Sequence, residues 1–575
     1  MLTAFALGVV LSAAGRLAAQ TPTPDTMQMS GMRMPGMGGT GGAPRMPPMP
    51  PYMRMPMLRG MEHVPPNVTP FLPGQDLDSA AVAAVPLATP RTVVRLADGD
   101  TLVLRASLVR RVIGGRTFVM YGYNTQFPGP LLRVRQHATI VVRFENQLDM
   151  PSSVHWHGVR VDNRADGVPG VTQEAVPVGG RYLYRVHFPD AGIYWYHPHV
   201  REDVQQGLGL FGNILVDAPD PGYYSPVNRE EVLLLDDLLL DHQGLFPFGR
   251  EAPDFTIMGR FGNVFLVNGE PEYRLAVGRG AVVRFFLTDA SSSRTYNLSF
   301  GGAPIKLVAA DVTRFEREEM VSSVVLAPAE RYVVEVRFDS SGTYPLTSRV
   351  QAINHVTGEF YPEVDTLGEI SVSRTPVGED RAAAFRTLRR DAALGVEIDR
   401  YRKDFDRSVD KELDLTVNIQ GLPIPLVTFM TTDTMYFPPV EWNDGMPDMN
   451  WVATGRETRW IMRDLATGKK NMDIAWHFKQ GEVAKIRLFN DPQAMHPMSH
   501  PIHFHGQRFL VLDRDGVPTT NFAWKDTVLL PVGSTVDILL EASNPGRWMA
   551  HCHIAEHLES GMHMTFTVDS AGAGP

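Results

Sequence analysis

Ten of the eighteen histidines lie in four short clusters near opposite ends of the chain, and this pattern constrains the fold more than any other feature. The clusters are His155-Trp156-His157, His197-Pro198-His199, His500 to His505, and His551-Cys552-His553 followed by His557. Successive side chains of a strand point to opposite faces, so each His-X-His pair sends both imidazoles to one side. Four converging pairs would surround one small volume with eight imidazoles. Since one metal takes about four to six ligands, the pattern predicts a metal cluster shared by distant parts of the chain.

Cys552 is the only cysteine, and it sits in the middle of the fourth cluster. Alternation along a strand points its side chain away from those of His551 and His553. Its thiolate is therefore expected to bind a different metal, with His557, Met562 and a histidine from elsewhere, best His500, as partners. Two imidazoles, one thiolate and a weak axial thioether form the ligand set of a blue-copper site.

The alternatives to copper fit the sequence poorly. Isolated buried histidines are more often core residues than ligands, but four clusters with this spacing are not isolated. Structural zinc sites usually contain several cysteines, and this chain has one. No haem or iron–sulfur motif is present in the sequence.

Length and charge limit the remaining classes. A chain of 575 residues is expected to form three or four domains. Its formal net charge of -10 would repel phosphate backbones, so no nucleic-acid partner is expected. Apart from the N-terminus, no stretch approaches the roughly 18–20 apolar residues of a membrane span, so none is expected in the mature protein.

From about Val93 onward, short runs rich in β-branched residues alternate with turn residues, which is typical of antiparallel β-sandwiches in series. Six runs are the clearest: Thr139–Phe144, Tyr182–Phe188, Ala281–Phe286, Tyr332–Phe338, Ala484–Phe489 and Thr535–Leu540. A strand followed by a turn, Gly and an aromatic residue recurs at Gly192, Gly342 and Gly546. We infer an all-β chain of three homologous domains, at about 90–220, 228–375 and 411–570, with a linker at 376–410. A charged helical stretch is expected near Arg381–Lys411.

The N-terminal part has two segments of its own character. Residues 1–20 contain an apolar run and small residues near Ala18, as in a secretory signal, so we expect export to a periplasm or the cell exterior. Residues 21–75 are rich in Met, Pro and Gly, with eleven methionines between Met27 and Met61, and are expected to be disordered. Thioethers suit Cu(I), so this segment is interpreted as a copper-collecting tail, and a plain linker is the alternative.

The four clusters resemble the copper-binding motifs of the multicopper oxidase family, which includes laccases, bacterial cuprous oxidases and spore-coat laccases. The resemblance spans about residues 90–570 and implies three cupredoxin-like Greek-key domains with four copper ions. Residues 228–375 contain only two histidines, His242 and His355, and no cysteine, so the middle domain is expected to be copper-free and to act as a spacer. It implies a mononuclear type 1 site of His500, Cys552, His557 and axial Met562. The type 2 copper would take His155 and His503. The type 3 pair would take His157, His197, His199, His505, His551 and His553.

The family reaction, oxidation of a donor coupled to reduction of dioxygen to water, also needs four protons. Asp166 resembles the family's acid near the cluster. Many bacterial members have a glutamate directly after the type 1 histidine, where this chain has Leu558. Glu556 and Glu559 are the nearest substitutes, and Glu556 is taken as the second candidate acid.

Three hypotheses remain for the function, and the first two differ in the electron donor. Cu(I) is favoured because Met495 and Met498 lie within five residues of His500 and the tail is rich in methionine. Cuprous oxidases of the family have an acid four residues before that histidine, whereas this chain has His496. Phenols, aromatic amines or Mn(II), as in laccases, are the alternative, and a non-catalytic copper-sequestering protein is a third. The sequence does not predict the oligomeric state.

Overall fold

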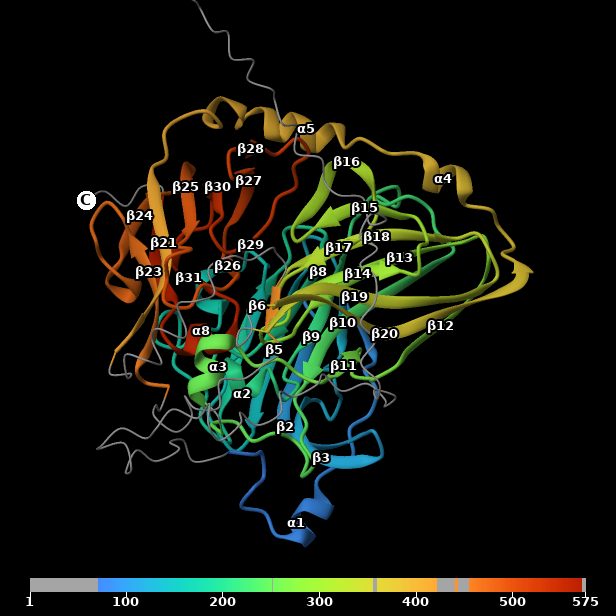
Figure 1. Ribbon diagram of the computed structural model, residues 1–575, viewed down its shortest axis with the longest axis horizontal. Coiled ribbons are helices and arrows are strands. Elements are labelled where there is room, and N and C mark those ends of the chain that lie inside the picture. Colours follow the sequence, from blue (N-terminus) through green and yellow to red (C-terminus); the bar gives the residue numbers. More distant parts are fainter. Residues whose placement is uncertain (1–70, 251, 355–358, 421–439, 443–454, 571–575) are drawn as a thin grey trace, which may run out of the picture. The chain divides into compact units, whose positions relative to one another are not determined.

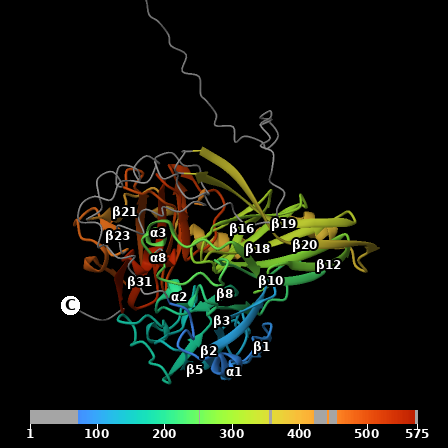
Figure 2. The same cartoon turned by 60° about the horizontal axis from the view of Figure 1, so that its bottom comes forward.

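The structure is a computed structural model that describes residues 71–250, 252–354, 359–420, 440–442 and 455–570. The expected signal at 1–20 and residues 21–70 of the methionine-rich segment lie outside the described residues. Within these residues the strands pair into six sheets, and Figure 1 shows how the strands are arranged. Figure 2 shows them as three groups, coloured blue to teal, green to yellow and orange to red along the chain. No helix in the described part of the chain is long and apolar enough to cross a membrane.

The first group of strands forms two sheets around one core. One sheet has the order β3-β2-β5-β7, with bounds Arg116–Tyr123, Thr101–Ile113, Thr139–Gln147 and Arg181–His187. The other has the order β1-β4-β9-β8-β6, with bounds Val93–Leu96, Leu131–Arg135, Gly212–Asp217, Gly192–His197 and His155–His157. Leu104 and Val142 of the first sheet share a buried cluster with Trp156 and Ile214 of the second. Short helical segments accompany the sheets: α1 (Ser79–Ala84), η1 (Asn163–Ala165) and α2 (Glu202–Gln205).

The middle group repeats this arrangement. One sheet has the order β11-β10-β13-β18-β15-β16, with bounds Val264–Val267, Arg229–Leu238, Ala281–Asp289, Arg331–Phe338, Ile305–Ala310 and Thr313–Val321. The other has the order β12-β20-β19-β14-β17, with bounds Tyr273–Arg279, Glu359–Pro376, Gly342–Asn354, Tyr296–Phe300 and Val324–Leu326. Strand β22 (Val440–Trp442) pairs with β19. Helix α3 (Ala252–Met258) lies between β10 and β11 in the sequence.

The third group again forms two sheets. One has the order β23-β21-β25-β30-β27-β28, with bounds Thr458–Asp464, Lys411–Ile419, Glu482–Asn490, Thr535–Ala542, Arg508–Arg514 and Val517–Pro518. The other has the order β24-β32-β31-β26-β29, with bounds Ala475–Lys479, His563–Asp569, Gly546–Cys552, His500–Phe504 and Thr527–Leu530. Helix α8 (Ala555–Glu559) follows β31, and η3 is Asn471–Asp473.

All six runs predicted as strands are strands, namely most of β5, β7, β13, β18, β25 and β30. The repeat is also structural, because Gly192, Gly342 and Gly546 each begin the strand that follows one of these, β8, β19 or β31. The prediction of an all-β chain is therefore confirmed. The charged stretch after residue 380 is less regular than expected, since it holds two separate helices, α4 (Ala382–Arg386) and α5 (Ala392–Asp399), and a turn of 3-10 helix, η2 (Arg402–Asp404).

Apolar contacts join neighbouring sandwiches. Ile193 and Leu215 of the first sandwich share a buried cluster with Phe286 and Val333 of the middle one. The segment expected to be only a linker takes part too, because Leu394 and Ile398 of α5 pack in a second cluster. That cluster joins Val312 of the middle sandwich to residues of the third, including Leu510 and Trp524.

A substitution at Gly506, directly after His505, tests how tightly the third sandwich is packed around Trp548. Its φ is +65°, and an added Cβ would lie 2.4 Å from the ring of Trp548. Gly516 has a similar φ of +75° but nothing within 4 Å, so it is the matched control. Gly516→Ala should lower the free energy of unfolding by about 1 kcal/mol through backbone strain. Gly506→Ala should cost roughly a further 1–3 kcal/mol through overpacking. Thermal unfolding midpoints of the two metal-free variants check this, and equal midpoints would contradict it.

Candidate metal centre

Each sandwich that carries histidine clusters presents them on two neighbouring antiparallel strands or, for His199, His505 and His553, just beyond the ends of those strands. In the first sandwich β6 pairs with β8, with His155 opposite His197. In the third sandwich β26 pairs with β31, with His503 opposite His551. The residue between two histidines points into its own sandwich, so Trp156 lies in the first core and Cys552 in the third. The imidazole side chains therefore project from the opposite face of each sheet, away from the core of its own sandwich.

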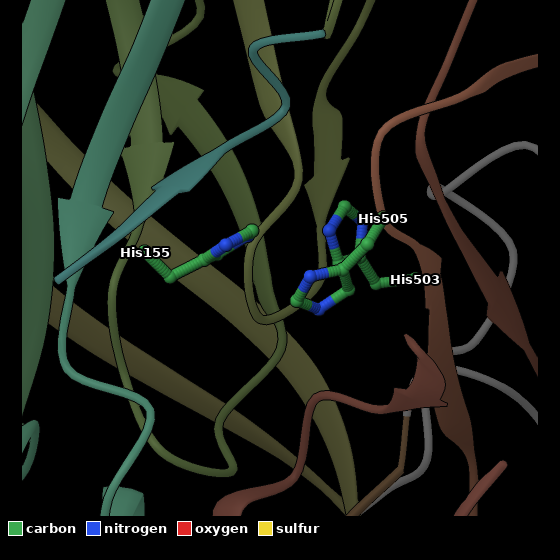
Figure 3. Close-up of side chains that lie close together, drawn as sticks. All are labelled: His155, His503 and His505. Carbon is green, nitrogen blue, oxygen red and sulfur yellow. The ribbon is translucent and has the colours of Figure 1, made fainter. Parts of the chain in front are cut away.

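These two sets of imidazoles meet in one buried group. The rings of His155 and His505 lie 4.1 Å apart between centroids, and those of His157 and His503 stack at 3.8 Å. The pairs His199–His551 and His197–His553 are each separated by 5.1 Å. Figure 3 shows His155 from the first sandwich facing His503 and His505 from the third. We call these eight residues, His155, His157, His197, His199, His503, His505, His551 and His553, the histidine cluster.

The cluster has the donor atoms that a group of metal ions requires. His155, His197 and His503 donate through Nδ1 to backbone carbonyls, at 2.8–2.9 Å. Their Nε2 atoms are buried and have no hydrogen-bond partner among the described residues. The same holds for His199 Nε2, His157 Nδ1 and both ring nitrogens of His553. Buried polar atoms are nearly always satisfied in proteins, so unpartnered nitrogens aimed at one place fit metal ligation.

Three-residue sets within the cluster are close enough to hold individual ions. Ligand atoms lie within 4.8 Å of one another in His155, His503 and His505; in His155, His157 and His197; and in His199, His505 and His551. Burial, and after it the neighbouring imidazoles, holds the pKa of His197, His199, His505, His551 and His553 well below the ordinary value. Neutral imidazole is the form that binds metals.

A second group lies on the other side of β31, inside the third sandwich. Cys552 Sγ is 3.5 Å from His500 Nδ1 and 3.8 Å from His557 Nδ1, and these two nitrogens are 3.3 Å apart. All three side chains are buried, as is Met562. Burial raises the pKa of the Cys552 thiol, and burial lowers the pKa of His500 to about 3. Cys552 and its two histidine neighbours thus face different groups, which is the arrangement that alternation along the strand predicts.

The two acids named from the sequence lie in different surroundings. Asp166 touches the histidine cluster, with Oδ2 3.0 Å from His505 Nδ1 and its backbone carbonyl bonded to His155. Glu556 instead accepts a hydrogen bond from Ser293 of the middle sandwich at 3.1 Å. Burial, and next the charge of Asp203, raises the pKa of Glu556 to about 7.

Two further carboxylates contact the cluster and were not predicted. Glu202 of α2 lies 3.1 Å from His199 Nδ1, and burial, followed by the charges of Glu559 and Asp203, raises its pKa well above the usual value. Asp526 lies 3.2 Å from His157 Nε2. Burial alone would raise the pKa of Asp526, but the Arg331 guanidinium and hydrogen bonds hold it well below its usual range. Glu202 stands three residues after His199, which is the only sequence signal that could have indicated either acid.

Helix α3 of the middle sandwich covers the outer edge of the second group. His557 Nε2 donates to the carbonyl of Ile257 at 3.2 Å, and Trp460 Nε1 donates to the carbonyl of Thr256 at 2.7 Å. The Trp460 ring also stacks on His557, with 3.9 Å between centroids. Met498 is buried in the core that contains Cys552, and Met495 packs against that core. The other methionines considered for this place, Met446 and Met449, lie outside the described residues.

Fold and geometry together define a copper-binding oxidoreductase built from three β-sandwiches. Family profiles described as multicopper oxidase match residues 109–221, 241–362 and 443–572. The chain belongs to the multicopper oxidase family, whose members hold four coppers and oxidise reducing substrates with dioxygen.

The similar proteins found by comparison support this family assignment. Multicopper oxidase MmcO of Mycobacterium tuberculosis is 26% identical over 523 residues, covering 84% of this chain and 89% of that protein. A copper resistance protein A homolog of Pseudomonas syringae pv. tomato is 24% identical over 536 residues, covering 78% and 88%. Plant and fungal laccases match as well. A solved multicopper oxidase of Pseudomonas thermotolerans is 26% identical with a TM-score of 0.58, covering 83% of this chain and all of that one.

Cys552→Ser tests the division into two metal groups. A blue-copper site gives an intense thiolate absorption at about 600 nm, which the variant should lose together with turnover. The histidine cluster should keep its metal, so bound copper should fall by one ion per chain. Ala550→Ser adds a hydroxyl on the same face of β31 and is the control that should keep the colour. Absorption spectra and metal analysis check this, and a blue band that survives in the serine variant would contradict it.

Proposed function

We propose that this oxidase takes its electrons from Cu(I) and protects the cell against copper. In this proposal His500, Cys552, His557 and Met562 hold the type 1 copper, and His155 and His503 hold the type 2 copper. The type 3 pair is held by His157, His197, His199, His505, His551 and His553. Bound copper would supply the one-electron redox chemistry that couples oxidation of the donor to the four-electron reduction of dioxygen to water. The chain itself contributes the ligands, a dry site and the acids.

The strongest support for a small donor is the covering of His557. The imidazole edge that faces away from Cys552 is bonded to the carbonyl of Ile257, and Trp460 lies flat against the ring. His500 and His557 are both at most 1% exposed. A phenol cannot stack on the His557 ring without displacing Trp460 or α3, whereas an ion needs only ligands that lead toward the site.

Methionines supply such ligands. Met498 and Met495 lie two and five residues before His500, and Met258 at the end of α3 belongs to the same buried cluster. Thioethers bind Cu(I) well and are not protonated, so they can pass it on without a change of pH. We propose that the methionine-rich residues 21–70 collect the ion outside the cytoplasm, after removal of residues 1–20. The mass of the mature chain tests that removal.

Two acids are proposed to supply protons. The proposed role of Asp166 is supported by its direct contact with His505 and His155, which places its carboxylate beside the histidine cluster. Glu556 is supported by its burial and its raised pKa, and its hydrogen bond with Ser293 leads toward the middle sandwich. General acids at such positions commonly contribute about 10²–10⁴-fold to a rate.

Asp166→Asn tests the first acid. The amide can still accept a hydrogen bond from His505 but holds no transferable proton, so dioxygen consumption with a fast donor should fall about 100-fold or more. Copper content and the blue band should stay unchanged. Asp162→Asn is the control, because that exposed carboxylate only caps η1 and pairs with Arg164. An Asp166→Asn enzyme with full copper and full rate would contradict the role.

Steady-state kinetics with Cu(I) and with a phenol test the donor. Met498→Leu should raise KM for Cu(I) by about tenfold, equivalent to about 1.4 kcal/mol, and leave phenol oxidation unchanged. Met120→Leu, buried in the first sandwich, is the control for loss of a thioether elsewhere. Deleting residues 21–70 should likewise weaken only Cu(I) oxidation. Phe71 is retained because its backbone pairs with Phe248.

The laccase-like alternative predicts the opposite pattern. Laccases are among the similar proteins, so oxidation of phenols, aromatic amines or Mn(II) is the second candidate. Phenol turnover that exceeds Cu(I) turnover, or that falls equally in the deletion variant, would favour it. A chain that binds copper but consumes no dioxygen with any donor would instead be a copper-sequestering protein.

A further inference from the structure

Arg331 begins strand β18 of the middle sandwich, yet it contacts all three sandwiches. Its Nη1 donates to Asp526 Oδ1 of the third sandwich at 2.7 Å, and Nη2 donates to the other oxygen of the same carboxylate. Its Nε donates to the carbonyl of Ile193, on strand β8 of the first sandwich, at 3.3 Å. Nη1 also bonds to the carbonyl of Ala329, and the side chain is fully buried.

The carboxylate that Arg331 holds reaches the histidine cluster. Asp526 Oδ1 is 3.2 Å from His157 Nε2 and 3.4 Å from His503 Nδ1. The hydroxyl of Thr527 donates to the same oxygen at 2.8 Å and lies 3.2 Å from each of these two ring nitrogens. His157 and His503 stack on one another, so a single oxygen contacts two neighbouring cluster residues.

This contact explains an exception within the cluster. Four cluster residues, His155, His157, His197 and His503, each bond through one ring nitrogen and leave the other buried and without a partner among the described residues. The unpartnered atom is Nε2 in His155, His197 and His503, but it is Nδ1 in His157. When His157 donates its Nε2–H to Asp526, its Nδ1 is left unprotonated and directed inward. The carboxylate therefore selects the tautomer that can bind metal in this orientation.

Gly158 leaves the space in which the ion pair lies. Its φ is +81°, and an added Cβ would lie 2.4 Å from Arg331 Nη2 and 2.7 Å from Asp526 Oδ2. The glycine that follows His157 thus allows the guanidinium and carboxylate to pass directly beside the cluster backbone. Three segments far apart in the sequence meet at this point.

We propose that Arg331, supplied by the middle sandwich, is a positioning residue of the copper cluster. It holds Asp526 so that the carboxylate of Asp526 orients His157 and the backbone carbonyl of Asp526 orients His503. The inference rests on the proposed ligand assignment. A guanidinium suits this task because its planar fork binds both oxygens of one carboxylate, which an ammonium cannot do with the same geometry. Asp311 accepts from the Arg331 backbone at 2.9 Å, lies 3.4 Å from Arg331 Nη1 and pairs with Lys525, so it balances the neighbouring charges while both oxygens of Asp526 keep the bidentate contact.

The experiment compares Arg331→Met, Arg331→Lys and Asp526→Asn with Arg284→Met in the copper-loaded full-length protein. Arg284 is the control because it lies on β13, next to β18, and forms a similarly buried pair with Glu335 at 2.7 Å. The measurements are copper per chain, the spin-resonance signal of the type 2 copper, the blue absorption, and the rate of copper loss to a chelator. Loss of an outer hydrogen-bond partner commonly weakens metal affinity about 10–100-fold.

Arg331→Met and Asp526→Asn should each speed copper loss from the cluster by about 10–100-fold and change the type 2 signal, with the blue band kept. Arg331→Lys should give a smaller effect of the same kind. The double variant, with Arg331→Met and Asp526→Asn together, should lose copper little faster than the faster of the two single variants, because the two residues act as a unit. Arg284→Met should lower the thermal midpoint but leave both spectra unchanged.

An unchanged type 2 signal and an unchanged copper-loss rate in Asp526→Asn and Arg331→Lys would overturn the proposal, even if Arg331→Met failed to fold. Equal effects from Arg284→Met would also overturn it, since any buried ion pair of the sheet would then serve. Failure of the ligand assignment is seen separately, because the unmodified protein would then lack the type 2 signal or bind fewer than four coppers.

Discussion

The whole site depends on the alternation of side chains along β31. Cys552 points into the core of the third sandwich, where it meets His500 and His557, while His551 and His553 point outward to the histidine cluster. The same alternation in β26 separates His500 from His503 and His505. Two metal groups are thereby held on opposite faces of one two-stranded unit, joined by single peptide links. A slip of one residue in the pairing would exchange the faces and abolish both groups.

The cluster also requires the first and third sandwiches to face one another, and the middle sandwich helps to hold them there. Its strand β18 provides Arg331, which bonds to both partners. Its helix α3 covers His557, and its Ser293 reaches Glu556. Segment 376–410 adds α5, which packs between the middle and third sandwiches. The middle sandwich and the segment 376–410 therefore connect the other sandwiches through specific side-chain contacts.

Sequence reasoning predicted the features that depend on local rules. Strand positions followed from β-branched runs, and the facing of the histidines and Cys552 followed from their parity along a strand. Asp526 and Arg331 could not be found this way, because they act across 369 and 195 residues of sequence on partners brought near only by folding. Neither lies in one of the four histidine clusters of the sequence, and each alone resembles an ordinary charged residue. The cover by α3 was equally hidden, since it uses backbone carbonyls, which carry no residue-specific signal.

Strand β13 is buried along its entire length, because its two faces serve different cores. Val283 and Phe285 pack inside the middle sandwich, while Phe286 packs against Ile193 and Leu215 of the first. Ile193 lies on the strand that carries His197, four residues further on. A change of volume at Phe286 would thus be transmitted across the boundary to a strand that positions the cluster. The three sandwiches cannot be exchanged as independent modules, however similar their folds, because each packs its apolar surface against that of its neighbour.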